Sequence, residues 1–83
     1  MKITVRYFAG IREAIGTASE VHQTECLTLA GLRDELIALG GVHADSLARG
    51  KAVRLALNQV MADESAALGD GAEVAFFPPV TGG

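Results

Sequence analysis

The 83-residue sequence lacks several features that would each point to a particular class of protein. It has a single cysteine, Cys26, so no disulfide can form within the chain. No apolar run approaches the length of a membrane span, and the alternation Ile3-Thr4-Val5-Arg6 interrupts the apolar stretch that a secretory signal requires. We therefore expect a cytoplasmic protein without a membrane segment.

Positive charge is also scarce. Seven basic residues against ten acidic residues give a formal net charge of -3, and the basic residues are scattered along the chain. Because binding to a phosphate backbone needs a concentrated positive surface, this composition argues against nucleic acid as a partner. The chain has no internal repeat, and its length allows one hydrophobic core with no room for a second. An independent catalytic cleft is not expected.

Few side chains are suited to chemistry. His22, Cys26 and His43 are the only soft metal ligands, and their spacing matches no known pattern of metal ligands, so no metal site is predicted. Cys26 lies beside Leu27 and can be interpreted as a nucleophile or sulfur donor, or as a buried packing residue, which is the interpretation we favour. The sequence has no glycine-rich phosphate-binding loop, so ATP, if it is used, is bound by another protein.

Hydrophobic periodicity predicts an α+β fold. Apolar and polar residues alternate in several short segments, as half-buried strands require, and leucines recur at three- and four-residue spacing in one segment that begins at Thr28 and ends at Gly40-Gly41. A loop is expected between this helix and residue 52. Strands are predicted at residues 2–9, 18–24, 52–57, 60–62 and 72–77, a short helical stretch at 11–15, and the main helix at 28–39.

The first two strands are expected to pair antiparallel, and Asn58-Gln59 is expected to form a tight turn between two later strands. The order β-β-α-β-β-β is that of a β-grasp, ubiquitin-like roll, in which a mixed sheet packs on one main helix. The predicted organisation is a β-grasp domain over residues 1–77 followed by an extended tail, 78–83.

Side-chain parity predicts an exposed aromatic patch. If Tyr7 and Phe76 point toward the helix, their neighbours Phe8 and Phe77 must point to the opposite face of the sheet. This face is predicted to be a partner surface, and the alternative is that neighbouring loops cover both rings. The other residues with the same parity are Arg6, Arg54, Ala56 and Ala75.

The last six residues, Pro78-Pro79-Val80-Thr81-Gly82-Gly83, favour a stiff, extended path with a narrow tip. Such a segment can thread into the tunnel of another protein, although a frayed terminus is the alternative interpretation. The α-carboxylate of Gly83 is ionised at neutral pH and is a nucleophile. Its attack on the α-phosphate of ATP held by another enzyme would give an acyl-adenylate, which sulfur could convert to a thiocarboxylate.

The chain resembles the ubiquitin-like sulfur carriers, in particular the small subunits of molybdopterin synthase. The resemblance covers essentially the whole length and departs from the family pattern at Ala72, where an acidic residue is more usual. It is carried by Tyr7-Phe8-Ala9, Arg12-Glu13, the segment from Leu68 to Val74, and Phe76-Phe77-Pro78-Pro79-Val80-Thr81-Gly82-Gly83.

The resemblance implies a carrier that is not an enzyme on its own and binds no cofactor. An E1-like enzyme would use ATP and Mg²⁺ to adenylate Gly83, and a sulfurtransferase system would convert the adenylate to a thiocarboxylate. The tail would then enter the large synthase subunit and donate sulfur to cyclic pyranopterin monophosphate within a heterotetramer. The candidate partner-binding residues are Phe8, Phe77 and Arg12.

Three alternatives remain open. The chain could be a sulfur carrier for another pathway, such as thiamine thiazole synthesis, which uses the same terminal chemistry. It could be a ubiquitin-like protein modifier that forms isopeptide bonds with lysines, or an interaction module whose tail has no chemical role.

Overall fold

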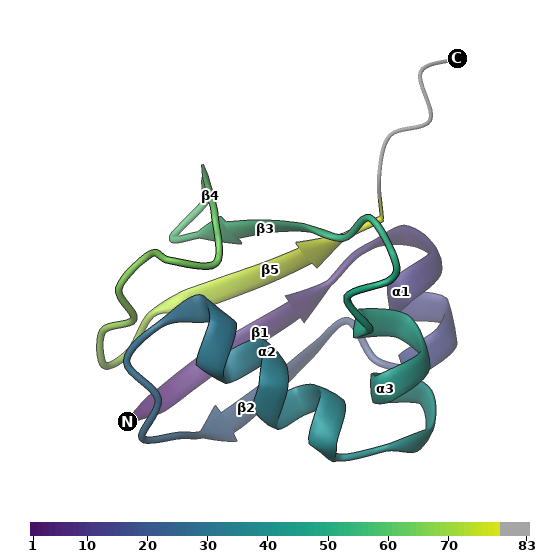
Figure 1. Cartoon of the computed structure of the whole chain (residues 1–83), viewed down its shortest axis with the longest axis horizontal. Helices are drawn as coiled ribbons and strands as arrows, with labels where there is room; N and C mark the ends of the chain where they lie inside the picture. The colour runs from purple at the N-terminus through teal and green to yellow at the C-terminus, as the bar shows by residue number, and fades with distance from the viewer. Residues whose placement is uncertain (79–83) are drawn as a thin grey trace.

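The structure, a computed structural model, describes residues 1–78, in which it has five strands and three helices. The strands are β1 (Lys2–Tyr7), β2 (Ser19–Gln23), β3 (Arg54–Leu57), β4 (Val60–Ala62) and β5 (Glu73–Phe77), and the helices are α1 (Ala9–Ile15), α2 (Leu29–Ala38) and α3 (Gly41–Leu47). The strands form one sheet in the order β2-β1-β5-β3-β4 (Figure 1). β1 and β5 are parallel, and the other neighbours are antiparallel. This is the mixed sheet of the β-grasp fold, as predicted.

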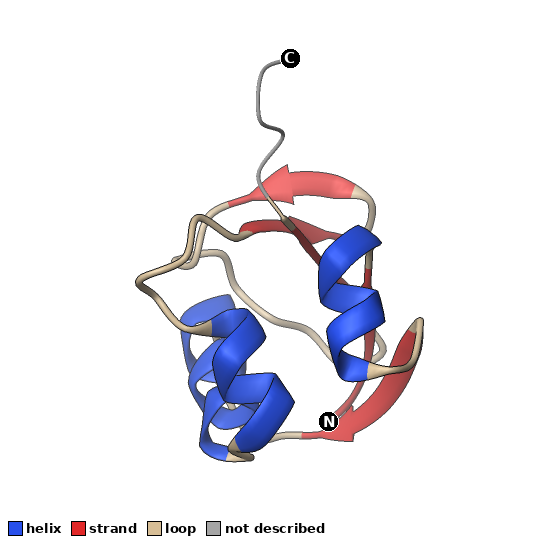
Figure 2. Ribbon diagram, turned by 90° about the vertical axis from the view of Figure 1, so that its right-hand side faces the viewer, coloured by secondary structure: helices blue, strands red, loops and turns tan. Residues whose placement is uncertain are grey.

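The hydrophobic core lies between one face of the sheet and the helices. Figures 1 and 2 show α2 crossing this face with α3 beside it. Alternate residues of β1 and β5 point inward, and the three- and four-residue spacing of the leucines in α2 places them on the facing side. The fully buried side chains are Ile3, Val5, Tyr7, Leu29, Leu32, Leu36, Leu47, Val74 and Phe76.

The two predicted hairpins are confirmed. β1 pairs with β2 in antiparallel register, with Val5 opposite Glu20. β3 pairs with β4 through a two-residue turn in which Asn58 and Gln59 have φ values of 50° and 69°. Left-handed backbone at both central residues is the conformation that matches the twist of a tight hairpin. The Asn58 side chain also accepts a hydrogen bond from the backbone N–H of Glu73, at 3.0 Å, so the turn is tied to β5.

The prediction of a single main helix was incomplete, because the residues expected to form a loop after Gly40 form α3. Gly40 does end α2, with φ 76°, but the chain turns directly into the new helix. Leu47 of α3 is fully buried, and its carbonyl accepts a hydrogen bond from Arg33 Nε at 2.7 Å. α3 is therefore stabilised by contacts with α2 that no local pattern reveals. Leu39, predicted to lie on the apolar face of the main helix, is 58% exposed.

The short predicted helix between the first two strands is confirmed and begins earlier, at Ala9. It ends at Gly16, whose φ of 91° is a conformation that glycine adopts without strain. In the described part of the chain, every helix is too short or too polar to span a bilayer. The division into a domain and a tail after residue 77 stays a prediction, because residues 79–83 lie outside the described residues.

Candidate docking surface and tail

The rings of Phe8 and Phe77 stack on the face of the sheet that the helices leave open. Their centroids are 4.7 Å apart and their planes differ by 16°. Phe8 directly follows β1 and Phe77 ends the parallel neighbour β5, so the pairing of Tyr7 with Phe76 brings the next two residues together. Tyr7 and Phe76 are fully buried, whereas Phe8 and Phe77 are half-buried, as the parity argument predicts. Their role in partner binding stays a prediction.

Arg6 holds the aromatic pair from one side. Its guanidinium carbon lies 5.4 Å from the centroid of the Phe8 ring, within the range of a cation–π contact. The same guanidinium forms an ion pair with Glu73 at 3.8 Å, between side chains that are both partly exposed. These two contacts restrict the orientation of the Phe8 ring before any partner arrives.

The remainder of this face is less aliphatic at its surface than expected. Ala56 and Ala75 share the predicted face, but they are only 3% and 5% exposed. Met61 lies opposite Ala56 in the β3–β4 register and is 56% exposed. It extends the docking surface, which we define as Arg6, Phe8, Arg54, Met61 and Phe77. Sequence reasoning missed Met61, although the two-residue turn at 58–59 fixes the register that places it there.

Arg12 lies one turn beyond Phe8 on α1, where its backbone N–H donates to the Phe8 carbonyl at 3.3 Å. Its side chain is exposed, and within residues 1–78 no hydrogen bond or ion pair joins it to the aromatic pair. Arg12 therefore lies one helical turn from the aromatic pair and is not joined to it, and its role in partner binding stays a prediction.

The tail begins at Pro78, which is half-buried and follows the aromatic pair directly. The other residues for which tail threading or chemistry is predicted, Pro79, Val80, Thr81, Gly82 and Gly83, lie outside the described residues. Their roles stay predictions.

The residues considered as metal ligands are used in hydrogen bonds to carboxylates. Glu35 accepts from Thr24 at 2.6 Å, from Cys26 at 3.0 Å, and pairs with His22 at 3.0 Å. These bonds, that of Thr24 above all, lower the pKa of Glu35 to about 2. No group of three histidine, cysteine or acidic residues within residues 1–78 is arranged to hold a metal ion.

Cys26 is not the buried packing residue that we favoured from the sequence, since its side chain is partly exposed. The hydrogen bond with Thr24 acts to lower the pKa of the thiol, but the bond to Glu35, burial and nearby negative charge outweigh it and raise the pKa overall. A thiol that donates to a carboxylate is a weak nucleophile. The structure thus gives no support to the interpretation of Cys26 as a reactive sulfur.

His43 forms a similar contact on α3. Its Nε2 lies 2.9 Å from Glu20, which also accepts a hydrogen bond from the Tyr7 hydroxyl at 2.7 Å. Burial acts to raise the pKa of Glu20, but the hydrogen bonds from His43 and Tyr7 outweigh it and lower the pKa. Burial, with the bond to Glu20, raises the pKa of Tyr7 far above its ordinary range. The contacts join β2 to the helical layer and have a structural role.

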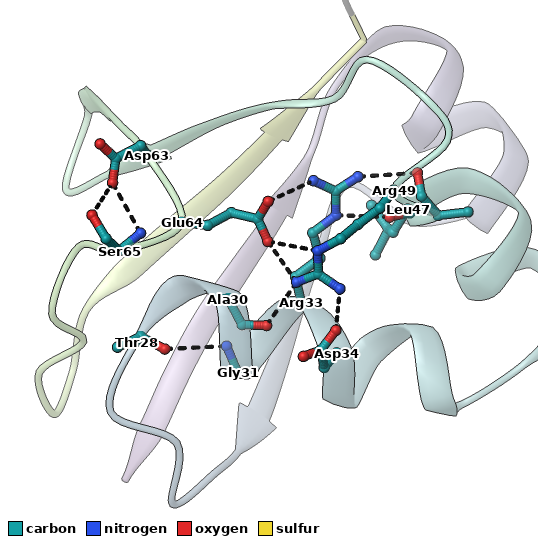
Figure 3. A network of polar contacts seen from close by, with 11 residues as sticks. Thr28, Ala30, Gly31, Arg33, Asp34, Leu47, Arg49, Asp63, Glu64 and Ser65 are labelled. Carbon is teal, nitrogen blue, oxygen red and sulfur yellow. Dashed lines mark hydrogen bonds and ion pairs between the residues drawn. The ribbon is translucent and has the colours of Figure 1, made fainter.

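The largest polar network also joins elements of the fold (Figure 3). Arg33, only 4% exposed, donates to the carbonyls of Leu47 and Ala48 at 2.7 and 3.1 Å and pairs with Glu64 at 3.6 Å. Arg49 is more exposed than Arg33; it pairs with Asp34 and donates through Nε to Glu64 at 3.0 Å. The network connects α2, the end of α3 and the segment after β4.

Comparison with known proteins gives the family of the chain. The ThiS family matches residues 5–83. The molybdopterin synthase sulfur carrier subunit of Escherichia coli (strain K12) is 41% identical over 81 residues, which are 98% of this chain and 99% of that protein.

Two solved structures have the same fold. One is the complex of subunits 1 and 2 of the molybdopterin-converting factor from Helicobacter pylori 26695, with 26% identity, a TM-score of 0.71 and 100% of both chains covered. The other is small archaeal modifier protein 1 of H. volcanii, with 25% identity, a TM-score of 0.72, and 95% of this chain and 98% of that chain covered. The chain therefore belongs to the ThiS family, and its relatives along nearly its whole length include molybdopterin synthase sulfur carrier subunits.

Proposed function

We propose that this protein is the sulfur carrier of a molybdopterin synthase. The observation that carries the proposal is the stacked pair of Phe8 and Phe77 at the point where the chain leaves the sheet, directly before the segment Pro78 to Gly83. The names of its relatives support the pathway, and the complex of two subunits supports a large-subunit partner. In this arrangement the domain binds the partner, and the tail delivers the reactive group.

The chemistry is proposed to take place at Gly83. A carboxylate oxygen attacks the α-phosphorus of ATP, the bond to the departing pyrophosphate breaks, and an acyl-adenylate forms. Sulfide from a sulfurtransferase system then attacks the acyl carbon and displaces AMP, which leaves a thiocarboxylate. An E1-like enzyme supplies the ATP site, Mg²⁺ and the basic groups that stabilise the developing charge. Glycine at positions 82 and 83 lets the backbone approach the nucleotide closely.

Delivery requires the large subunit. The docking surface binds that subunit, and residues 78–82 thread toward its active site. The thiocarboxylate sulfur bonds to cyclic pyranopterin monophosphate, and water then cleaves the bond between the sulfur and the Gly83 acyl carbon, so that the sulfur stays on the pterin and the Gly83 carboxylate is restored. The lysines and phosphate-binding groups of the reaction belong to the large subunit. The carrier itself thus acts as one component of a heteromeric sulfurtransferase, arranged as a heterotetramer.

A second candidate function is protein modification, favoured by the similarity to small archaeal modifier protein 1. Both functions begin with adenylation of Gly83 and differ in the group that displaces AMP, sulfide in one case and a lysine amine in the other. A carrier for thiamine thiazole synthesis would share the thiocarboxylate and differ in its acceptor.

The deciding experiment is reconstitution. The purified chain is incubated with its activating enzyme, ATP and sulfide, and its intact mass should show one oxygen exchanged for sulfur. The product is then mixed with purified large subunit and the pterin precursor, and molybdopterin should form. A chain without Gly83 is the control and should yield none. Lysine conjugates without thiocarboxylate would favour the modifier, and molybdopterin formed by the shortened chain would refute the proposed role of Gly83.

A further inference from the structure

A groove of about 200 Å³ lies beside the start of the tail, and neither Phe8 nor Phe77 is among its lining residues. Pro78 forms part of its wall, α1 contributes Ile11 and Ala14, and the segment before β3 contributes Lys51 and Val53. α3 contributes Ser46, a buried polar residue that is 8% exposed. Two helices and the segment before β3 therefore meet at Pro78, the residue from which the tail departs.

The groove is apolar at its base and open at its rim. Ile11 is 6% exposed and Val53 is half-buried, whereas Ala14 is exposed and too small to close the space above them. Gly10 also lines the groove, and an added Cβ there would have nothing within 4 Å. Small residues on α1 thus leave a hollow that an apolar side chain from outside can fill.

Lys51 is the only charged residue that lines the groove. It is exposed, and it makes no ion pair within residues 1–78. Arg49, two residues earlier in the chain, differs in that it forms ion pairs with Asp34 and Glu64. A carboxylate placed beside the groove would therefore find a cation without an internal competitor.

The position of the groove gives it a partner. Phe77 points to the open face of the sheet and Pro78 lines the groove, so the chain leaves the domain between two different surfaces. A protein that encloses residues 79–83 must bring the rim of its tunnel up to Pro78 on both sides. On one side the rim meets the aromatic pair, and on the other it meets the groove. Because interface cores pack as densely as protein interiors, an empty groove there would leave a costly void.

We propose that this groove receives an aliphatic side chain of the large synthase subunit, on a segment that also places a carboxylate beside Lys51. The inference rests on the proposed function, since it names a second contact made by the partner that receives the tail. The large subunit would then contact the domain at two places beside the start of the tail: at Phe8 and Phe77, and at the groove.

The first test fills the groove. Ala14→Leu places a larger side chain at an exposed position of α1, and leucine is a good helix former, so the domain should keep its melting temperature. We expect its affinity for the purified large subunit to fall by about tenfold or more, because the partner's side chain is displaced. Ala14→Ser changes the residue without filling the groove and should bind as the parent chain does. Titration calorimetry measures all three.

The second test reverses the charge and does not depend on how Ala14→Leu folds. Lys51→Glu should weaken binding severalfold, and the loss should shrink as salt is added. Lys2→Glu makes the same change of net charge at the exposed start of β1 and should leave binding nearly unchanged.

The outcomes separate this inference from the function on which it rests. If Phe77→Ala weakens binding while Ala14→Leu and Lys51→Glu bind as the parent does, the groove is not a contact and the inference is wrong, but docking through the aromatic face stands. If none of the three weakens binding, both surfaces are excluded. If the parent chain does not bind the large subunit at all, the proposed function fails and the inference fails with it.

Discussion

Phe8 and Phe77 come from positions 69 residues apart in the sequence and stack with their ring centroids 4.7 Å apart, where the chain leaves the sheet. Both rings remain half-buried, so each keeps a surface for a partner. We predict that Phe77→Ala weakens binding of the large subunit by about tenfold or more, since a truncated aromatic anchor commonly costs 2 kcal/mol or more. Calorimetric titration measures the change.

The neighbouring phenylalanine provides the control. Phe76 is fully buried, so Phe76→Ala should lower the free energy of unfolding by about 3–5 kcal/mol. Phe77→Ala should cost much less stability, because its ring is only half-buried. Equal losses of stability in the two variants, or an unchanged affinity of Phe77→Ala, would contradict the assignment of Phe77 to the docking surface.

The parts of this fold that sequence predicted well are those set by local alternation and turn chemistry. In β1 and β5, successive side chains point to opposite faces of the sheet. This alternation alone predicts that Phe8 and Phe77 lie on the same face, as the structure has them. The Asn58-Gln59 turn was predictable because asparagine tolerates positive φ. In both cases the information lies within a few residues.

The parts that sequence missed depend on contacts between distant residues. α3 lies in a polar segment, and it is held by Leu47 in the core and by hydrogen bonds from Arg33 to its end. Cys26 is partly exposed and donates to Glu35, nine residues away. The groove beside Pro78 exists only because α1, α3 and the segment before β3 meet there. None of these relationships has a local signature.

The second prediction concerns the buried arginine. Arg33→Met keeps most of the side-chain volume but removes the side-chain donor to the Leu47 carbonyl, while the Ala48 carbonyl keeps its hydrogen bond from the Lys51 N–H at 2.9 Å. A buried acceptor left without a donor is costly, so we expect a loss of about 2–4 kcal/mol in the free energy of unfolding, measured in urea. Arg49→Met removes the exposed arginine of the same network and should change stability little. Similar losses in both variants would show that burial of Arg33 is not the source of the effect.

The third prediction concerns acid. The pKa of Glu35 falls from its ordinary value of 4.5 to about 2 in the folded protein, chiefly through the hydrogen bond from Thr24. A carboxylate with a lowered folded-state pKa stabilises the fold above its unfolded pKa, and this stabilisation is lost as the pH falls toward the folded pKa. The difference in unfolding free energy between the parent and Glu35→Gln should therefore be constant near neutral pH and shrink between about pH 4.5 and 2. A difference that does not change with pH would be contrary to this account.

The fourth prediction concerns the thiol of Cys26, which donates a hydrogen bond to the Glu35 carboxylate. The pKa of Cys26 is raised, because the contacts with Glu35 together with burial outweigh the opposing effect of Thr24. At about neutral pH, iodoacetamide should therefore alkylate Cys26 more slowly than it alkylates a free cysteine, although the side chain is partly exposed. Glu35→Gln should speed the reaction, as followed by intact mass. Rapid alkylation of the parent chain would contradict a raised pKa of Cys26 and would support its interpretation as a reactive thiol.

The fifth prediction tests the β3–β4 turn. Gln59 has φ 69°, in the left-handed region where a Cβ costs about 1 kcal/mol and glycine is free of that cost. Gln59→Gly and Gln59→Ala both remove the exposed side chain, but only glycine also removes the Cβ. The glycine variant should be more stable than the alanine variant by up to about 1 kcal/mol in urea unfolding, and the register that places Met61 opposite Ala56 should be retained. If the alanine variant were the more stable of the two, the turn in solution would differ from the one described.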